Sequence, residues 1–299
     1  MQDVAWIAVD WGTSHLRAWV MRSDGSVIER RQSTDGMGTL DPTGFEPALQ
    51  KLCGDVLPVP VLACGMVGSR QGWAEAPYAS VPCAPPGADA ATTAKTTLEG
   101  LSVRILPGVK QARPADVMRG EETQIAGYLA TNPGFDGVIC LPGTHTKWAH
   151  ISAGEIVSFR TAMTGEMFAL LSAHSVLRHS MGDGWDDAAF AAGVDQAISR
   201  PESLAASLFS LRAEGLLDGL DPNAARARLS GLLIGAELAA MRPYWLGQQV
   251  AMIGAQSLAR AYTSALATQG VPVHQTPSAE DMTLAGLTAA YTQIYGGAE

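Results

Sequence analysis

A carboxylate, a glycine and a threonine stand together at the end of the first apolar segment of the chain. Asp10, Gly12 and Thr13 directly follow the apolar residues 4–9. Glycine lets the backbone approach a phosphate closely, and threonine adds a hydroxyl beside exposed N–H groups. One aspartate can serve Mg²⁺, which keeps several waters and uses few protein oxygens. The segment predicts a site for Mg²⁺ and phosphate, although the turn of a plain hairpin has the same residue types.

A second glycine–threonine pair follows another apolar segment near the middle of the chain. Gly143 and Thr144 come after residues 138–141. When Gly143 is laid on Gly12, Thr144 falls on Thr13, and the apolar segments around the two turns match. An internal repeat of this kind indicates a repeated structural unit. We therefore predict two similar lobes, each opening with a three-stranded unit, whose turns grip a polyphosphate from both sides.

The second turn differs from the first in its chemistry. Leu141 takes the place of Asp10, so the second turn can supply hydrogen-bond donors and no metal ligand. Lys147, just beyond it, is interpreted either as a phosphate contact or as a solvated strand lysine. The chain has neither G-x-x-x-x-G-K-[ST] nor a strand-linked G-x-G-x-x-G, which argues against P-loop and Rossmann sites.

A pair of glutamates could supply a proton acceptor. Glu121 and Glu122 lie in the first turns of a helix that we expect to begin near Asp116 as its N-cap. A carboxylate there could accept the proton of an attacking hydroxyl. Acids are also ordinary at this position, because they complement the helix dipole.

Residues 254–257 separate an expected strand from an expected helix. Their small side chains at Gly254, Ala255 and Ser257 would let an adenine or ribose lie against the backbone. A plain β–α turn explains the same residues equally well.

The elements that must position these residues follow from the hydrophobic pattern. Short apolar runs separated by turns predict an antiparallel meander at the start of the chain, and longer periodic segments predict a helical second half. The expected strands are residues 4–9, 16–21, 27–30, 59–63, 103–106, 138–141, 147–151, 156–160, 250–253 and 271–273, and the expected helices are 165–177, 187–198, 224–240 and 257–267.

Composition narrows the class of protein. A chain of 299 residues is long enough for two cores. The net charge of −9 and the lack of a basic stripe argue against nucleic acid or an anionic membrane as the main partner. The four cysteines show no metal-binding spacing, and the sequence shows neither a signal peptide nor an apolar run of about 20 residues. We expect reduced cysteines and a cytoplasmic protein.

Several of these segments together resemble the 2-dehydro-3-deoxygalactonokinase family of the sugar kinase/heat-shock/actin superfamily. The resemblance covers nearly the whole chain and is strongest over residues 4–175. The segments that carry it are IAVDWGT at 7–13, GMVGSRQGW at 65–73, RGEETQ at 119–124, LPGTHTKW at 141–148 and TAMTGE at 161–166.

This resemblance implies an α/β fold of two ribonuclease-H-like (actin/hexokinase-type) lobes around a central nucleotide cleft. The lobes would be residues 1–118 and 119–283, with a C-terminal helix at 284–299 packing back on the first lobe. It also implies phosphorylation of the C6 hydroxyl of 2-dehydro-3-deoxy-D-galactonate in galactonate breakdown, with ATP and Mg²⁺. A homo-oligomer is compatible with it.

The resemblance assigns roles to residues as well. Asp10, Gly12 and Thr13 match the phosphate-1 motif, Gly143, Thr144 and His145 match phosphate-2, and Gly254, Ala255 and Ser257 correspond to the adenosine motif.

Many members of the superfamily carry an acid where this chain has Leu141, so the base is left open. By similarity to the exopolyphosphatase branch we favour Glu121 as the base, then Glu122, with Asp10 as metal ligand. For the sugar acid we expect Arg70 to hold the carboxylate and Trp73 to pack on the sugar.

Gly36 and Met37 complete the expected substrate site. The alternatives are a kinase for the gluconate-derived epimer, a polyphosphate or nucleotide phosphohydrolase, and a non-catalytic nucleotide sensor.

Overall fold

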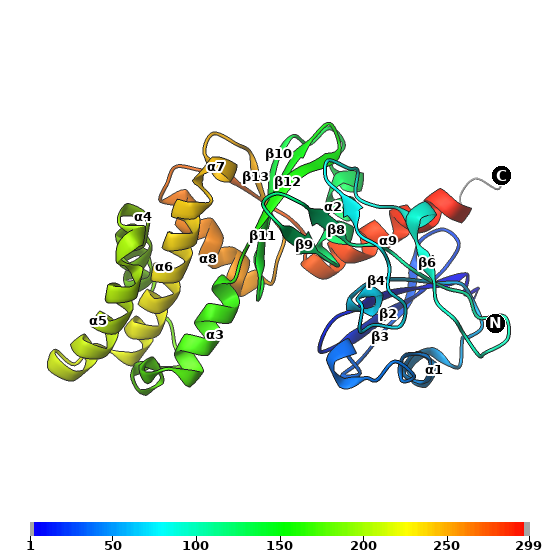
Figure 1. The fold of residues 1–299 in the computed structure, drawn as a ribbon, viewed down its shortest axis with the longest axis horizontal. Helices are drawn as coiled ribbons and strands as arrows, with labels where there is room; N and C mark the ends of the chain where they lie inside the picture. The colour runs from blue at the N-terminus through cyan, green and yellow to red at the C-terminus, as the bar shows by residue number, and fades with distance from the viewer. Residues whose placement is uncertain (1–2, 296–299) are drawn as a thin grey trace. The chain divides into compact units, whose positions relative to one another are not determined.

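The computed structural model describes residues 3–295, which form two compact units (Figure 1). Unit 1 comprises Met1–Asp136, Ile151–Ser158 and Pro277–Glu299, and unit 2 comprises Gly137–His150 and Phe159–Thr276. The first division thus falls after Asp136, whereas the resemblance placed it after residue 118. The described part of the expected C-terminal helix, up to Tyr295, belongs to unit 1, and its last four residues lie outside the described residues.

The main sheet of unit 1 has the strand order β3-β2-β1-β4-β7-β6. Strands β1, β2 and β3 pair antiparallel, which confirms the expected meander, and β4 and β7 add in parallel. Every residue of β1 except Asp10 is buried, because apolar clusters cover both faces of this sheet. The strands are β1 (Trp6–Trp11), β2 (Leu16–Met21), β3 (Val27–Ser33), β4 (Val61–Gly65), β6 (Thr92–Thr93) and β7 (Val103–Ile105).

The helices of unit 1 lie on both sides of this sheet. Residues of α1 (Phe45–Cys53) contribute to one apolar cluster and residues of α9 (Ala279–Tyr295) to the other. Helix α9 also packs closely on α2 (Glu121–Thr131), where a Cβ on Gly286 would overlap the carbonyl oxygen of Thr123. Close backbone packing therefore joins the end of the chain to the helix that carries the glutamates.

The expected helix start near Asp116 is wrong. Residues Asp116–Met118 form strand β9, which pairs antiparallel with β8 (Val109–Gln111) in a small sheet completed by β5 (Ala79–Ser80). Helix α2 begins only at Glu121, because Gly120 has φ = 108°, a conformation that favours glycine and interrupts regular structure.

A second sheet, whose residues outside 151–158 belong to unit 2, has the order β12-β11-β10-β13-β14, which repeats the order β3-β2-β1-β4-β7 of the first sheet. Strands β10, β13 and β14 run parallel. This correspondence confirms the internal repeat and the α/β fold class. The strands are β10 (Gly137–Leu141), β11 (Thr146–Ser152), β12 (Glu155–Ala162), β13 (Val250–Met252) and β14 (Val273–Gln275), the last lying two residues later than expected.

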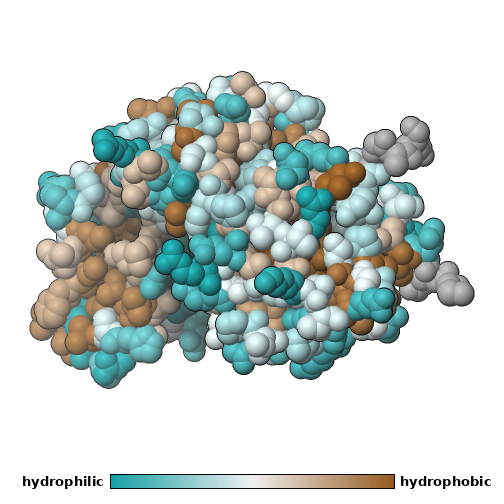
Figure 2. Space-filling view, turned by 45° about the vertical axis from the view of Figure 1, so that its right-hand side comes forward, coloured by the Kyte–Doolittle hydropathy of each residue, from teal (hydrophilic) through white to brown (hydrophobic). Residues whose placement is uncertain are grey.

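Unit 2 is mainly helical beyond its sheet, as the pattern predicted. Helices α4 and α5 both contact α6 (Figure 1). Large apolar side chains remain exposed on α3 and α5, and hydrophobic residues gather at the left of Figure 2. The helices are α3 (Thr164–His174), α4 (Asp187–Ser199), α5 (Leu204–Leu217), α6 (Pro222–Ala240), α7 (Arg242–Trp245) and α8 (Gln256–Ala267). Within residues 3–295 no helix has the length and apolar content to cross a bilayer.

Candidate active site

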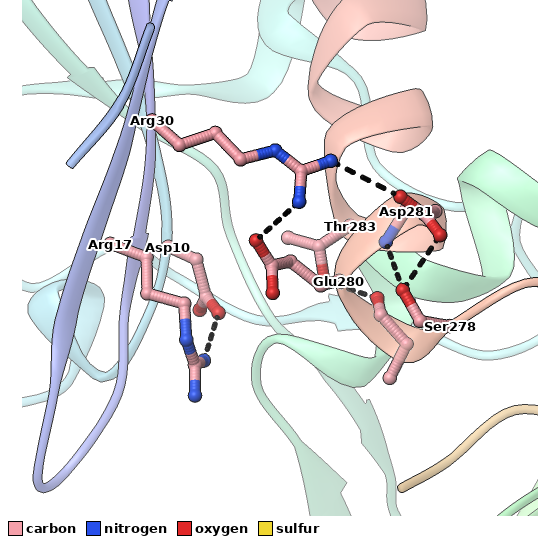
Figure 3. A network of polar contacts seen from close by, with 8 residues as sticks. Asp10, Arg17, Arg30, Ser278, Glu280, Asp281 and Thr283 are labelled. Atoms are coloured by element: carbon pink, nitrogen blue, oxygen red, sulfur yellow. Dashed lines mark hydrogen bonds and ion pairs between the residues drawn. The ribbon is translucent and has the colours of Figure 1, made fainter. Parts of the chain in front are cut away.

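Asp10 lies near the end of β1, directly opposite Arg17 on β2. Arg17 Nη1 donates to Asp10 Oδ2 over 3.0 Å, and the aspartate side chain is 18% exposed (Figure 3). Burial raises the pKa of Asp10, while the charge and hydrogen bond of Arg17 lower it and the charge of Glu280 raises it. The carboxylate is therefore largely withdrawn from water yet remains partly accessible at the edge of the sheet.

The glycine–threonine turn after Asp10 is supported by residues 36–38. Met37 N donates to the carbonyl of Gly12 over 3.0 Å, and Gly38 N donates to that of Thr13 over 2.8 Å. A Cβ on Gly36 would overlap the backbone of the turn. Two of the expected substrate residues, Gly36 and Met37, therefore lie against the phosphate-1 turn itself.

Three separate chain segments meet beside Asp10. Gly65 ends β4 with φ = 89°, and a Cβ there would lie 3.5 Å from Asp10 Oδ1. A Cβ on Gly120 would lie 3.6 Å from the Cα of Gly65. The start of α2, with Glu121 as its first residue, is thereby brought to the same edge of the sheet as the aspartate.

The two glutamates differ in accessibility. Glu122 is 1% exposed, and both of its carboxylate oxygens accept from Gly120 N over 2.8 Å. Burial, followed by the charge of Glu121, raises the pKa of Glu122 to about 7. Glu121 is partly exposed and accepts from Arg119 N over 3.0 Å. Glu122 is hydrogen-bonded at the N-terminal end of α2, and Glu121 is the carboxylate that a ligand can reach.

Arg119, which the sequence did not single out, fixes the loop after β4 to the start of α2. Its guanidinium lies 4.3 Å from the centre of the Tyr78 ring, and Nη2 donates to the carbonyl of Ala76 over 2.8 Å. A Cβ on Gly68 would lie 2.7 Å from Nη1. In the sequence a single arginine next to two acids does not indicate that it connects two segments.

The two other expected substrate residues differ in their surroundings. The Trp73 ring stacks on Phe45 with centroids 6.3 Å apart, and its Nε1 donates to the carbonyl of Lys95 over 3.1 Å. The Arg70 side chain is 82% exposed, and its ion-pair partner is Glu75 at 3.8 Å. Packing thus fixes the tryptophan at the edge of the core, whereas the arginine extends into solvent.

In unit 2 the second glycine–threonine turn is held by the start of α3. Glu166 N donates to the carbonyl of Thr144 over 2.9 Å, and a Cβ on Gly165 would overlap the carbonyl oxygen of Gly143. His145 Nε2 lies 2.6 Å from Glu166 Oε2. The segment at 161–166 therefore supports the turn directly.

The third expected motif borders this turn. Gly254 follows β13, and a Cβ there would lie 3.2 Å from the carbonyl oxygen of Pro142. Ala255 is the N-cap of α8. Its methyl group cannot accept a hydrogen bond, so that side chain leaves the first N–H groups of α8 uncapped. The second glycine–threonine turn and the expected adenosine motif thus lie together.

Lys147 proves to be buried. It is 6% exposed, and its Nζ donates to Thr161 Oγ1 over 2.9 Å. The interpretation as a solvated strand lysine is therefore wrong.

A cavity of about 310 Å³ opens next to these motifs within unit 2. Three aromatic residues, Phe168, Trp185 and Tyr262, line it, and Arg226 lies 5.1 Å from the Phe168 ring centre. This is within the size range of small-molecule sites. Of the lining residues the sequence predicts a ligand contact only for Ser257, since residues scattered over three helices and a loop leave no local motif. The lining is Thr164, Gly165, Phe168, Trp185, Arg226, Ser230, Leu233, Ile234, Ser257, Leu258, Ala261 and Tyr262.

Comparisons with known proteins identify the family of the chain. The family model described as 2-keto-3-deoxy-galactonokinase matches residues 10–290. A probable 2-dehydro-3-deoxygalactonokinase of Rhizobium meliloti (strain 1021) is 39% identical over 298 residues, 96% of this chain and 97% of the relative. The 2-dehydro-3-deoxygalactonokinase of Escherichia coli (strain K12) is 37% identical over 274 residues, 90% and 91% of the two chains.

Solved structures show the same fold. A crystal structure from Sinorhizobium meliloti, of a protein assigned as a 2-dehydro-3-deoxygalactonokinase, superposes with a TM-score of 0.92 at 38% identity and covers 97% of this chain and 99% of that one. Component A of the (R)-2-hydroxyglutaryl-CoA dehydratase of Acidaminococcus fermentans shares the fold alone, with a TM-score of 0.55 at 14% identity and coverage of 97% and 98%. On the extent of these matches, the chain belongs to the 2-keto-3-deoxy-galactonokinase family.

Proposed function

We propose that the chain transfers the γ-phosphoryl group of ATP to the C6 hydroxyl of 2-dehydro-3-deoxy-D-galactonate. The observation that carries this proposal is the match to two curated relatives named for this activity, along at least 90% of the chain. The reaction would belong to galactonate breakdown. A cytoplasmic location and a homo-oligomer remain predictions of the sequence.

The nucleotide is proposed to occupy unit 2 with its base in the 310 Å³ cavity. Trp185 and Phe168 offer aromatic surface for the base, and Ser257 offers a hydroxyl. The phosphates would then reach Gly143 and Thr144 and the N–H groups at the start of α8. Helix N-termini favour anions because unpaired N–H groups and the helix dipole point at them.

The Asp10 carboxylate of unit 1 is a suitable ligand for the Mg²⁺ that accompanies ATP. Asp10 presents one carboxylate beside a phosphate-binding turn, and Arg17 is bonded to only one of its two oxygens. Mg²⁺ is bound through one or two carboxylates, waters and substrate phosphates. Bound there, it would neutralise charge on the phosphates.

Glu121 is proposed as the general base. Its carboxylate would take the proton from the C6 hydroxyl as the oxygen forms a bond to the γ-phosphorus. The bond from that phosphorus to the bridging oxygen breaks, and ADP leaves. Positioning and charge neutralisation dominate phosphoryl transfer, so one carboxylate is sufficient for the proton.

The sugar acid is proposed to lie near the phosphate-1 turn. Met37 is hydrogen-bonded to that turn and Gly36 packs against its backbone. The ring centroids of Trp73 and Trp11, the residue after Asp10, lie 6.1 Å apart. Arg70 remains the proposed partner of the substrate carboxylate. Its side chain is 82% exposed and therefore free to reorient.

An ADP-release assay with three conditions tests the function: 2-dehydro-3-deoxy-D-galactonate, its gluconate-derived epimer, and no sugar acid. We expect release to depend on the galactonate-derived acid, with phosphorus NMR showing a C6 phosphate ester. Faster ADP release with the gluconate-derived epimer would make that epimer the substrate. Equal release without any sugar acid would indicate a phosphohydrolase, and nucleotide binding without turnover a sensor.

A further inference from the structure

A carboxylate that plays no part in the proposed chemistry lies buried behind the nucleotide motifs of unit 2. Glu237, on α6, is 5% exposed. Its Oε1 accepts from Trp148 Nε1 over 2.7 Å. Its Oε2 accepts from Tyr262 OH over 2.7 Å and, in a shorter contact, from Thr164 Oγ1. The carboxylate thus joins β11, α3 and α8 to α6.

The network extends one step further toward the phosphate-2 turn. Thr146 Oγ1 lies 2.9 Å from Tyr262 OH, and both groups are buried. Because the tyrosine hydroxyl donates its proton to Glu237, Thr146 donates to the tyrosine oxygen. Thr146 is the residue after His145, so the chain of hydrogen bonds ends at the turn itself.

Each partner of Glu237 belongs to an element that carries part of the site. Thr164 begins α3, whose next residues support the Gly143–Thr144 turn. Tyr262 and Thr164 also line the 310 Å³ cavity. The carboxylate therefore connects the expected phosphate contacts with the expected base pocket.

The hydrogen bonds of Glu237 suggest a role in arrangement rather than in stability. Its partners Trp148, Thr164 and Tyr262 are neutral N–H or O–H donors, and no arginine or lysine pairs with the carboxylate in the described residues. Burial raises the pKa of Glu237, and the three hydrogen bonds act to lower it. An apolar side chain would fill such a site at less cost in desolvation. A carboxylate instead imposes direction, since its donors must converge on two oxygens.

We propose that Glu237 is a positioning residue that holds the phosphate-2 turn, the start of α3 and helix α8 in the one arrangement that binds nucleotide. This inference rests on the proposed use of ATP. Glu237 does not itself line the cavity, so it would act through the residues that it holds.

The first variant is Glu237→Gln, which keeps the shape of the side chain but turns one acceptor into a donor facing other donors. We expect the KM for ATP to rise at least about tenfold, the scale of one lost hydrogen bond to a charged group, while the KM for the sugar acid stays within twofold. The matched control is Glu46→Gln. Glu46 is 8% exposed and accepts from Thr97 and Leu98 in unit 1, so it should lower thermal stability without changing the KM for ATP.

Thr146→Val is the second variant, because Glu237→Gln could prevent folding. Thr146 is fully buried and does not line the cavity, and valine has nearly the same shape and suits a strand. We expect the KM for ATP to rise severalfold. Its control is Thr283→Val, which removes a buried hydroxyl that donates to the carbonyl of Ala279 on α9.

Direct binding of ATP and ADP, measured by calorimetry, separates the possible failures. Wild-type protein that binds neither nucleotide would refute the proposed function. Wild-type protein that binds while both variants match their controls in nucleotide affinity would overturn the positioning role and leave the function intact.

Discussion

His145 Nε2 lies 2.6 Å from Glu166 Oε2, so that the phosphate-2 turn and the first turn of α3 are joined by a side-chain contact as well as by the backbone. Both side chains are substantially exposed, at 47% and 37%. An exposed pair of this kind adds little stability. Its evident effect is to orient the imidazole, as a carboxylate commonly does for histidine.

The first prediction concerns this pair. If His145 contacts phosphate, His145→Ala should lower kcat/KM for ATP by about 10- to 100-fold, the range for a hydrogen bond to a charged group. Glu166→Gln should lower kcat/KM for ATP less, because it only loosens the orientation of the His145 ring. His174→Ala, at the other end of α3, serves as the control. Equal kinetics for His145→Ala and His174→Ala would exclude a phosphate contact.

Asp10→Asn should nearly abolish turnover. The substitution keeps the shape of the side chain and removes the charge that is proposed to organise the metal, so a loss of about 100-fold or more is expected. The measurement is the rate as a function of free Mg²⁺ at saturating ATP and sugar acid. A variant with wild-type rates over the whole Mg²⁺ range would remove Asp10 from the metal site.

Glu121→Gln and Glu122→Gln should differ sharply. Loss of a general base lowers the rate by about 10²- to 10⁴-fold, and we expect that of Glu121→Gln with nucleotide affinity nearly unchanged. Glu122→Gln should stay within a few fold, because Glu122 is 1% exposed and bonded to Gly120. Single-turnover rates and nucleotide dissociation constants check this. The reverse ranking would transfer the role of base to Glu122.

The raised pKa of Glu122 also predicts that the free energy of unfolding depends on pH. Its pKa of about 7 in the folded protein exceeds the ordinary value of 4.5. Between these values the folded state keeps a proton that the unfolded state has lost, so this group makes stability fall as pH rises from about 4.5 to 7. Relative to wild type, Glu122→Gln should therefore gain about 3 kcal/mol across that range. Urea unfolding at several pH values measures the difference, and a constant difference would contradict the prediction.

Arg70→Ala should raise the KM for the sugar acid by about tenfold or more, with the KM for ATP unchanged, if the guanidinium binds the substrate carboxylate. Its present partner Glu75 lies 3.8 Å away, and both side chains are mostly exposed. Their pairing should therefore contribute little to stability. Arg113→Ala, another exposed arginine of unit 1, is the control. Identical kinetics for the two variants would show that Arg70 does not bind the substrate carboxylate.

The sequence alone determined the repeated three-stranded unit and the two glycine–threonine turns. These are local features: Asp10, Gly12 and Gly143 follow apolar strands directly, and the alternation of apolar runs with turn residues is set by short-range chemistry. Helices α3, α4, α6 and α8 of the second half were also predictable for this reason, whereas α5 was not expected. The start of α2 was not, because pairing of Asp116–Met118 with β8 outweighed the capping tendency of an aspartate.

Only the tertiary structure decided which of two adjacent glutamates is accessible, that Lys147 is buried, and that Glu237 joins β11, α3 and α8 to α6. The cavity lined by Phe168, Trp185 and Arg226 likewise appeared only in the fold. The physical reason is that burial and hydrogen-bond partners depend on residues far apart in sequence. Trp148 and Tyr262 reach one carboxylate from positions 89 and 25 residues away, and no local pattern records that convergence.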